Sequence, residues 1–134
     1  MAFVISNPLL DELRAWRAGR EIRDTVEEEL DAYCMDPGLG PGWYLTADGR
    51  VLRDGRGWDD APLREATEAE AFRAIVVGAK KTGISSLLAL LPPQPDGASP
   101  CKRCDGTRSA ALGPHGNGPR LVCPSCCGLG WVVR

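Results

Sequence analysis

The spacing of apolar residues predicts helices over the first third of the chain. The Ser-Asn-Pro sequence at residues 6–8 is a typical helix start, because a capping side chain precedes a proline in the first turn. Two apolar stripes at helical spacing follow, one made of Leu9, Leu13 and Trp16 and the other of Ile22, Val26, Leu30 and Tyr33. The stripes are out of register, since the step from 16 to 22 turns a helix by roughly 240°. We therefore expect one kinked helix or two short helices that end before Asp36.

The pattern changes after the Pro- and Gly-rich residues 36–42. Two β-prone runs, residues 43–46 and 50–53, flank the sequence Ala47-Asp48-Gly49. Asp-Gly between such runs is a strong hairpin signal, because both residues tolerate the backbone angles of a tight turn. The sequence therefore predicts a β-hairpin here.

A second helical region begins near residue 67. Thr67 and Glu70 have the spacing of a capping box, and the helix that follows should reach about Lys81. Its buried face is predicted to contain Phe72, Ile75 and Val76. A short apolar helix at residues 84–91 should end at the two prolines that follow.

Four cysteines in the last third form two C-x-x-C pairs: Cys101, Cys104, Cys123 and Cys126. Two such pairs, 18 residues apart, are a strong zinc signal, because two intervening residues let both sulfurs of a pair reach one ion. Glycines after each pair suit a backbone that turns sharply around thiolate sulfur. The sequence therefore predicts one Zn²⁺ held by these four cysteines. An iron–sulfur or other metal site and free or redox-active thiols are the alternatives.

Three other residues bear on the ligand set. Cys127 lies beside Cys126, so it is able to replace it as a ligand or to form a surplus reactive thiol, although an ordinary small residue is the simpler interpretation. His115, the only histidine, would have to displace a cysteine from a well-spaced pair. Cys34 is most simply a core residue.

Residues 92–100 contain four prolines and one glycine but no large apolar side chain. That composition is typical of a semi-rigid, extended linker. We therefore predict an α+β protein with three parts: a small acidic helical body with a β-hairpin at residues 1–91, the linker at 92–100, and a zinc-knuckle β-hairpin module at 101–134.

Charge is divided unevenly between these parts. Residues 1–100 contain 11 Lys and Arg against 17 Asp and Glu, whereas residues 101–134 contain five against one. The basic residues of the module either offset the negative charge of a metal bound by four thiolates or contact nucleic acid. Five basic residues are few for nucleic-acid binding, which depends on several phosphate contacts.

The cysteine pattern resembles the C-x-x-C-x-G-x-G element of the cysteine-rich zinc domain of DnaJ-type co-chaperones. Residues 123–130 match this element completely, and residues 101–108 match it except at Arg108, which replaces a glycine. The resemblance covers roughly 30 residues and two of the four repeats of the full domain, which implies one zinc ion where the full domain binds two. The His-Pro-Asp of the J-domain has no counterpart, since His115 is followed by Gly116. Residues 1–100 resemble no family that we recognise.

Four cysteine ligands leave no coordination position for water or substrate, so the predicted zinc is structural. We expect Leu121-Val122 and residues 131–133 to pair as short strands, with Trp131 covering the site. An exposed strand edge or the face of Trp131 is then expected to accept a partner peptide. The predicted function is that of a non-enzymatic protein-interaction or adaptor protein. The alternatives are a thiol–disulfide protein and a nucleic-acid-associated zinc ribbon that uses Lys102, Arg103, Arg108 and Arg120.

Residues 1–100 contain no phosphate-binding loop, nucleophile elbow or zinc-protease motif. Runs of carboxylates such as Asp59-Asp60 and residues 27–29 are typical of solvated surfaces. We expect Trp16, Trp43 and Trp58 to lie in the core. The chain start lacks the pattern of a secretory signal and residues 87–91 are too short to span a membrane, so we expect a cytoplasmic protein without a membrane partner.

Overall fold

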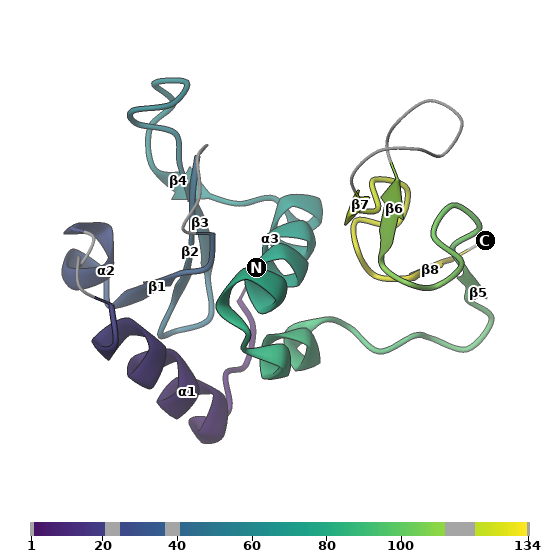
Figure 1. Ribbon diagram of the computed structural model, residues 1–134, viewed down its shortest axis with the longest axis horizontal. Coiled ribbons are helices and arrows are strands. Elements are labelled where there is room, and N and C mark those ends of the chain that lie inside the picture. The colour runs from purple at the N-terminus through teal and green to yellow at the C-terminus, as the bar shows by residue number, and fades with distance from the viewer. Residues whose placement is uncertain (1, 21–24, 37–40, 112–119, 134) are drawn as a thin grey trace. The chain divides into compact units, whose positions relative to one another are not determined.

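The computed structural model of the chain divides into two compact units, Met1–Leu90 and Leu91–Arg134 (Figure 1). The structure describes residues 2–20, 25–36, 41–111 and 120–133. The first unit combines helices with a four-stranded antiparallel sheet, and the second contains two small two-stranded sheets. The predicted α+β class is thus confirmed.

The first helix, α1, spans Asn7–Ala18 and begins as its sequence predicts. The Ser6 side chain accepts a hydrogen bond from the Leu9 N–H at 3.3 Å, and a proline occupies the first turn. Leu9 and Leu13 are buried, so the first apolar stripe is the face that α1 turns toward the core.

The second apolar stripe does not continue as a helix through Tyr33, and that prediction is wrong. Helix α2 covers Thr25–Glu29 only, and the chain then enters strand β1, Ala32–Cys34. Asp31 takes a left-handed backbone with φ of 46°, which ends the helical turn. All three β1 residues are buried. Apolar residues at these positions fit a buried strand as well as one face of a helix, so the sequence pattern alone does not distinguish the two. Ile22 lies outside the described residues.

The predicted hairpin is confirmed as β2, Gly42–Thr46, and β3, Val51–Asp54. The strands pair with Leu45 opposite Val51, and Gly49 adopts φ of 92° in the turn between them. The sheet order is β1-β2-β3-β4, where β4 is the short edge strand Arg64–Glu65.

Helix α3, Glu68–Thr82, has both hydrogen bonds of the predicted capping box and ends at Gly83. Phe72 and Ile75 are buried, whereas Val76 is only partly so. Gly78 lets the helix approach the sheet closely, because a Cβ there would lie 2.8 Å from the Met35 Cβ. The apolar segment after α3 forms a 3₁₀ helix, η1, at Ser85–Leu90.

Among the described residues, no helix has the length and apolar character needed to cross a membrane.

One of the carboxylates predicted to be solvated is in fact buried. Glu27 has no exposed surface; it pairs with the Arg20 guanidinium and accepts a hydrogen bond from the Cys34 N–H at 3.3 Å. A buried carboxylate needs such partners, since taking an unpaired charge out of water costs several kcal/mol. Cys34 itself is buried, as predicted.

The three tryptophans of the body differ in their surroundings. Trp16 packs against the buried cluster that contains Val26 and Tyr44, and Trp43 is partly buried. Trp58 is 61% exposed, so its predicted place in the core is wrong. It lies in the loop between β3 and β4, outside the layers that form the core.

We expect Tyr33→Phe to stabilise the body. Tyr33 is fully buried, and its hydroxyl has no hydrogen-bond partner among the described residues, so the native state carries the cost of desolvating that group. The substitution should raise the unfolding free energy by about 1 kcal/mol, measured by urea denaturation. A loss of stability would show instead that the hydroxyl is bonded to water or to another part of the chain.

We expect Glu70→Gln to destabilise the body in a pH-dependent way. Two hydrogen bonds from the Arg64 guanidinium, at 2.8 and 3.0 Å, lower the pKa of Glu70 from its ordinary 4.5 to about 2. A lowered carboxyl pKa stabilises the fold above pH 4.5, and this contribution is lost as the pH falls toward 2. The difference from wild type should be on the order of 0.5–1 kcal/mol at pH 7 and should shrink steadily below pH 4.5. Glu68→Gln, in the same helical turn, controls for the loss of one negative charge; a difference for Glu70→Gln that does not vary with pH would contradict the assignment.

Candidate metal centre

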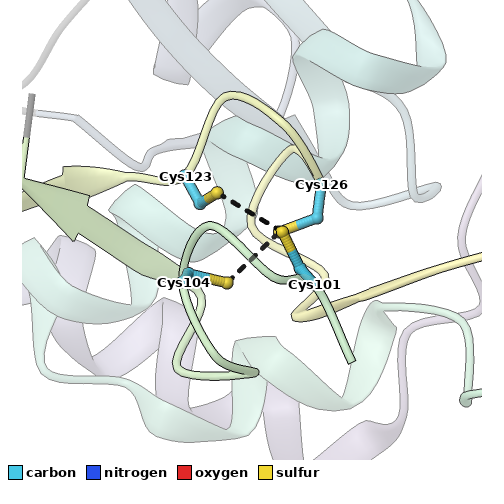
Figure 2. Close-up of side chains that lie close together, drawn as sticks. All are labelled: Cys101, Cys104, Cys123 and Cys126. Carbon is cyan, nitrogen blue, oxygen red and sulfur yellow. Dashed lines mark hydrogen bonds between the residues drawn. The ribbon is translucent and has the colours of Figure 1, made fainter. Parts of the chain in front are cut away.

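The second unit brings together the four cysteines singled out by their spacing. The sulfurs of Cys101, Cys104, Cys123 and Cys126 all lie within 4.8 Å of one another (Figure 2). Each of the four side chains is at least 95% buried. They come from two tight turns, one following β5 (Ser99–Pro100) and the other following β7 (Arg120–Val122). This grouping is suited to hold one metal ion.

The sulfur separations fit tetrahedral coordination. The Cys101 and Cys123 sulfurs are 3.8 Å apart, and so are those of Cys104 and Cys126. A tetrahedron with metal–sulfur bonds of about 2.3 Å has sulfur–sulfur edges of about 3.8 Å. A disulfide would require about 2.05 Å, and all four cysteines are free thiols. The donor set and its spacing are therefore consistent with a zinc site.

The two turns have the same backbone conformation, one repeat of the motif matching the other. In the first, left-handed φ values occur at Asp105, Gly106 and Arg108 (51°, 78° and 72°). In the second, they occur at the equivalent Cys127, Gly128 and Gly130 (53°, 82° and 85°). Arg108, the one departure from the glycine pattern, thus adopts the backbone that the glycine would have. A left-handed non-glycine residue costs roughly 1–2 kcal/mol.

Arg108 also makes a contact that glycine lacks. Its guanidinium Nη1 donates a hydrogen bond to the Gly128 carbonyl at 3.3 Å, which links the first turn to the second. No local sequence signal predicts this contact, because it joins residues 20 positions apart.

Reciprocal backbone hydrogen bonds join the two turns. The Cys101 N–H donates to the Gly130 carbonyl at 3.0 Å, and the Cys123 N–H donates to the Arg108 carbonyl at 2.9 Å. The first cysteine of each turn is therefore held by the last residue of the other turn. Each turn is therefore held in position by the other turn.

Hydrogen bonds and burial set the ionisation of the thiols. A hydrogen bond from the Cys104 backbone N–H lowers the pKa of Cys101 to about 7. Burial raises the pKa of Cys126 to about 12, even though the Gly130 N–H donates to its sulfur at 3.2 Å. Without a cation, one sulfur in the cluster thus ionises far more readily than another. A bound metal removes this difference, because a coordinating thiol is deprotonated outright.

The structure has strands at the predicted positions around the site, but they pair with other strands than predicted. Leu121 and Val122 belong to β7, which pairs with β6 (Ser109–Ala111). Strand β8, Trp131–Val132, pairs instead with β5, whose two residues fall at the end of the Pro-rich segment assigned to the linker. Leu129 and Val132 are the partly buried apolar residues packed against the cysteines, and Trp131, predicted to cover the site, is not among them.

The other residues that the sequence suggested for a site lie apart from the four cysteines or outside the residues that the structure describes. Cys127 is partly buried, and it is Cys126 whose sulfur joins the group. Cys34 belongs to the core of the first unit. Lys102 and Arg103 are exposed and line a groove with Ser125 and Val132. His115 lies outside the described residues, and Arg120 is described only as part of β7.

Comparison with known proteins leaves the chain without a family: no family model matches it, and neither a curated protein nor a solved structure matches it.

We expect Gly130→Ala to weaken the metal centre more than Gly106→Ala. Both glycines have left-handed φ values, so both substitutions strain the backbone. A Cβ at Gly130 would also lie 3.0 Å from the Gly106 carbonyl oxygen, whereas a Cβ at Gly106 would meet the Gly130 oxygen at an ordinary 3.7 Å. Competition with a chromogenic chelator should show the larger loss of zinc affinity for Gly130→Ala. Equal losses would mean that backbone angle alone, and not this close approach, determines the cost.

Proposed function

We propose that the four cysteines hold one structural Zn²⁺ and that the protein is a non-enzymatic protein-interaction or adaptor protein. The observation that carries the metal assignment is the set of four buried sulfurs at tetrahedral spacing. Thiolates favour zinc among the common divalent ions, and four of them leave no open position for a substrate or water. The ion's contribution is then to folding, on the order of 10–16 kcal/mol in zinc-finger peptides.

The resemblance to the cysteine-rich module of DnaJ-type co-chaperones supports this proposal. The matching left-handed residues show that the two copies of the motif also share their backbone angles at these positions, including the one where Arg108 replaces glycine. The module then acts as a small rigid platform. Its two sheets have two strands each, so their backbone edges are available for strand addition by a partner peptide.

A nucleic-acid-associated zinc ribbon is the second candidate. The exposed Lys102 and Arg103 beside the first cysteine pair favour it, since they line one groove together with Ser125. Phosphate contacts weaken steeply as salt rises, so salt dependence separates the two functions. A thiol–disulfide function is less favoured, because a metal bound by all four sulfurs would leave none of them free to react.

We expect the purified protein to contain one zinc per chain by elemental analysis. Cys126→Ser should lose most of the metal, because one of four ligands is removed from a closed site. Cys127→Ser is the matched control, one residue away and outside the sulfur group, and it should retain the metal. Chelation should unfold the module, seen as collapse of its amide resonances. Full zinc content in Cys126→Ser together with loss in Cys127→Ser would reassign the ligand.

Affinity purification from the native host tests the adaptor function. After nuclease treatment, a specific protein should co-purify with the zinc-loaded chain and be lost with Cys126→Ser. If the chain instead binds an oligonucleotide pool with an affinity that falls steeply between 50 and 200 mM salt, on the order of the losses seen for phosphate contacts, the nucleic-acid function replaces the proposal.

A further inference from the structure

A cavity of about 410 Å³ lies in the first unit, between α3 and the strands β2 and β3. Its lining includes Trp43, Arg53, Glu70, Arg73, Ala74 and Val77. Small-molecule sites have volumes of about 300–1,000 Å³, so this cavity is large enough to hold a ligand. Neither the metal centre nor the proposed adaptor function accounts for it.

The sheet and the helix each contribute one wall of the cavity. Trp43 of β2 pairs with Arg53 of β3, so both side chains lie on the same face of the sheet. The next residues along the strands, Tyr44 and Leu52, belong to the buried cluster on the opposite face. Helix α3 packs beside the sheet (Figure 1), and its four lining residues recur at i, i+3, i+4 and i+7, which places them on one side of the helix. Regular secondary structure thus fixes both walls.

Part of the lining is apolar. The Trp43 ring is partly buried, and the Arg53 guanidinium lies 5.8 Å from its centroid. Arg53 is itself held in place, since it donates to both oxygens of Asp59, at 2.5 and 3.4 Å. Ala74 and Val77 add aliphatic surface from the helix. An aromatic or aliphatic ligand body would remove these groups from water, which favours binding.

Both carboxylates of the lining already have basic partners. Asp36 pairs with Lys81. The Arg64 guanidinium donates to both oxygens of Glu70, at 2.8 and 3.0 Å. A cationic ligand would therefore have to displace a side chain of the protein from either carboxylate.

Arg73 is the charged lining residue for which the described part of the chain provides no partner. Its guanidinium is exposed and makes no hydrogen bond or ion pair with the described residues. Asp36, Arg53 and Glu70 are each neutralised by a partner, so Arg73 leaves the described lining with one net positive charge.

A free guanidinium favours a carboxylate ligand. Its two parallel N–H groups match the two oxygens of one carboxylate. A phosphate would bring further charge and a further oxygen that this single group does not match.

We propose that the cavity binds a small organic carboxylate, with the apolar body of the ligand against Trp43 and its carboxylate paired with Arg73. The inference goes beyond the proposed function and does not rest on it, because the site belongs entirely to the first unit.

The test titrates the full-length, zinc-loaded protein, labelled with 5-fluorotryptophan, with phenylacetate, indole-3-acetate and hexanoate. At least one acid should bind saturably, with a dissociation constant in the millimolar range or below, as expected for ligands of this size. The Trp43 resonance, assigned through Trp43→Phe, should shift as the site fills. The Trp16 resonance should not, because Trp16 packs against the cluster on the opposite face of the sheet. The corresponding neutral amide should bind at least tenfold more weakly.

Three variants locate the carboxylate and the ligand body. Arg73→Gln should weaken binding of the acid roughly tenfold and bring its affinity to that of the amide. Arg14→Gln removes another exposed arginine of the same unit and should leave the affinity unchanged. Val77→Phe places a larger side chain in the cavity and should prevent binding of acid and amide alike, with urea denaturation confirming that the variant folds.

Several outcomes would overturn the inference. Equal affinity for acid and amide, a preference that survives Arg73→Gln, or the absence of any saturable Trp43 shift each does so. Phenyl phosphate that binds more tightly than phenylacetate would reassign the ligand to a phosphate. A Gly-Gly-Phe peptide that binds more tightly than phenylacetate and than its own amide would replace the free acid with the carboxyl terminus of a peptide. Zinc content and zinc-dependent partner binding are measured separately, so this inference and the proposed function fail independently.

Discussion

Four sulfur atoms within 4.8 Å of one another form the buried centre of the second unit. In the parts of that unit whose side-chain burial the structure describes, residues 91–108 and 122–133, the buried apolar side chains are the four cysteines and Leu91. A segment of this size cannot bury enough apolar surface to offset its conformational entropy. Under the proposed function, the ion that these sulfurs are arranged to hold takes the place of a hydrophobic core, and coordination offsets the cost of the left-handed backbone around it.

The first unit folds by a different balance of forces. Its stability comes from a sheet and helices that bury residues such as Leu13, Leu45 and Ile75. The buried carboxylate of Glu27 is paired with Arg20, and Thr67 and Glu70 cap the start of α3. If the proposed metal site is correct, the chain combines a unit built on apolar burial with one built on coordination.

Local chemistry explains which features were predictable from the sequence. Each C-x-x-C pair, the Asp-Gly hairpin and the capping box depend on residues close together in the chain, and each has a specific spacing. Strand β1 was missed because Val26 and Tyr33 are buried whether the segment is helical or extended, and only pairing with β2 decides between them. The pairing of β8 with β5 was missed for a similar reason, since it joins residues more than 30 positions apart.

Two predictions of burial or exposure were wrong, because composition does not determine where a single side chain lies. Glu27 belongs to an acidic run of the kind that usually faces solvent, yet the N–H of Cys34 and the guanidinium of Arg20 hold it inside. Trp58 has the character of a core residue, yet it lies in the loop folded around the Gly55 carbonyl and is exposed. In both cases, contacts that the sequence pattern does not encode determined the outcome.

The crossed backbone hydrogen bonds between the two cysteine turns have a consequence for how the module folds. Because the Cys101 N–H is bound by residue 130 and the Cys123 N–H by residue 108, neither repeat is a complete folding unit. A single repeat would have an unsatisfied backbone donor and only two of the four sulfurs. The two repeats therefore form one cooperative unit, in which neither turn keeps its position when the other is lost.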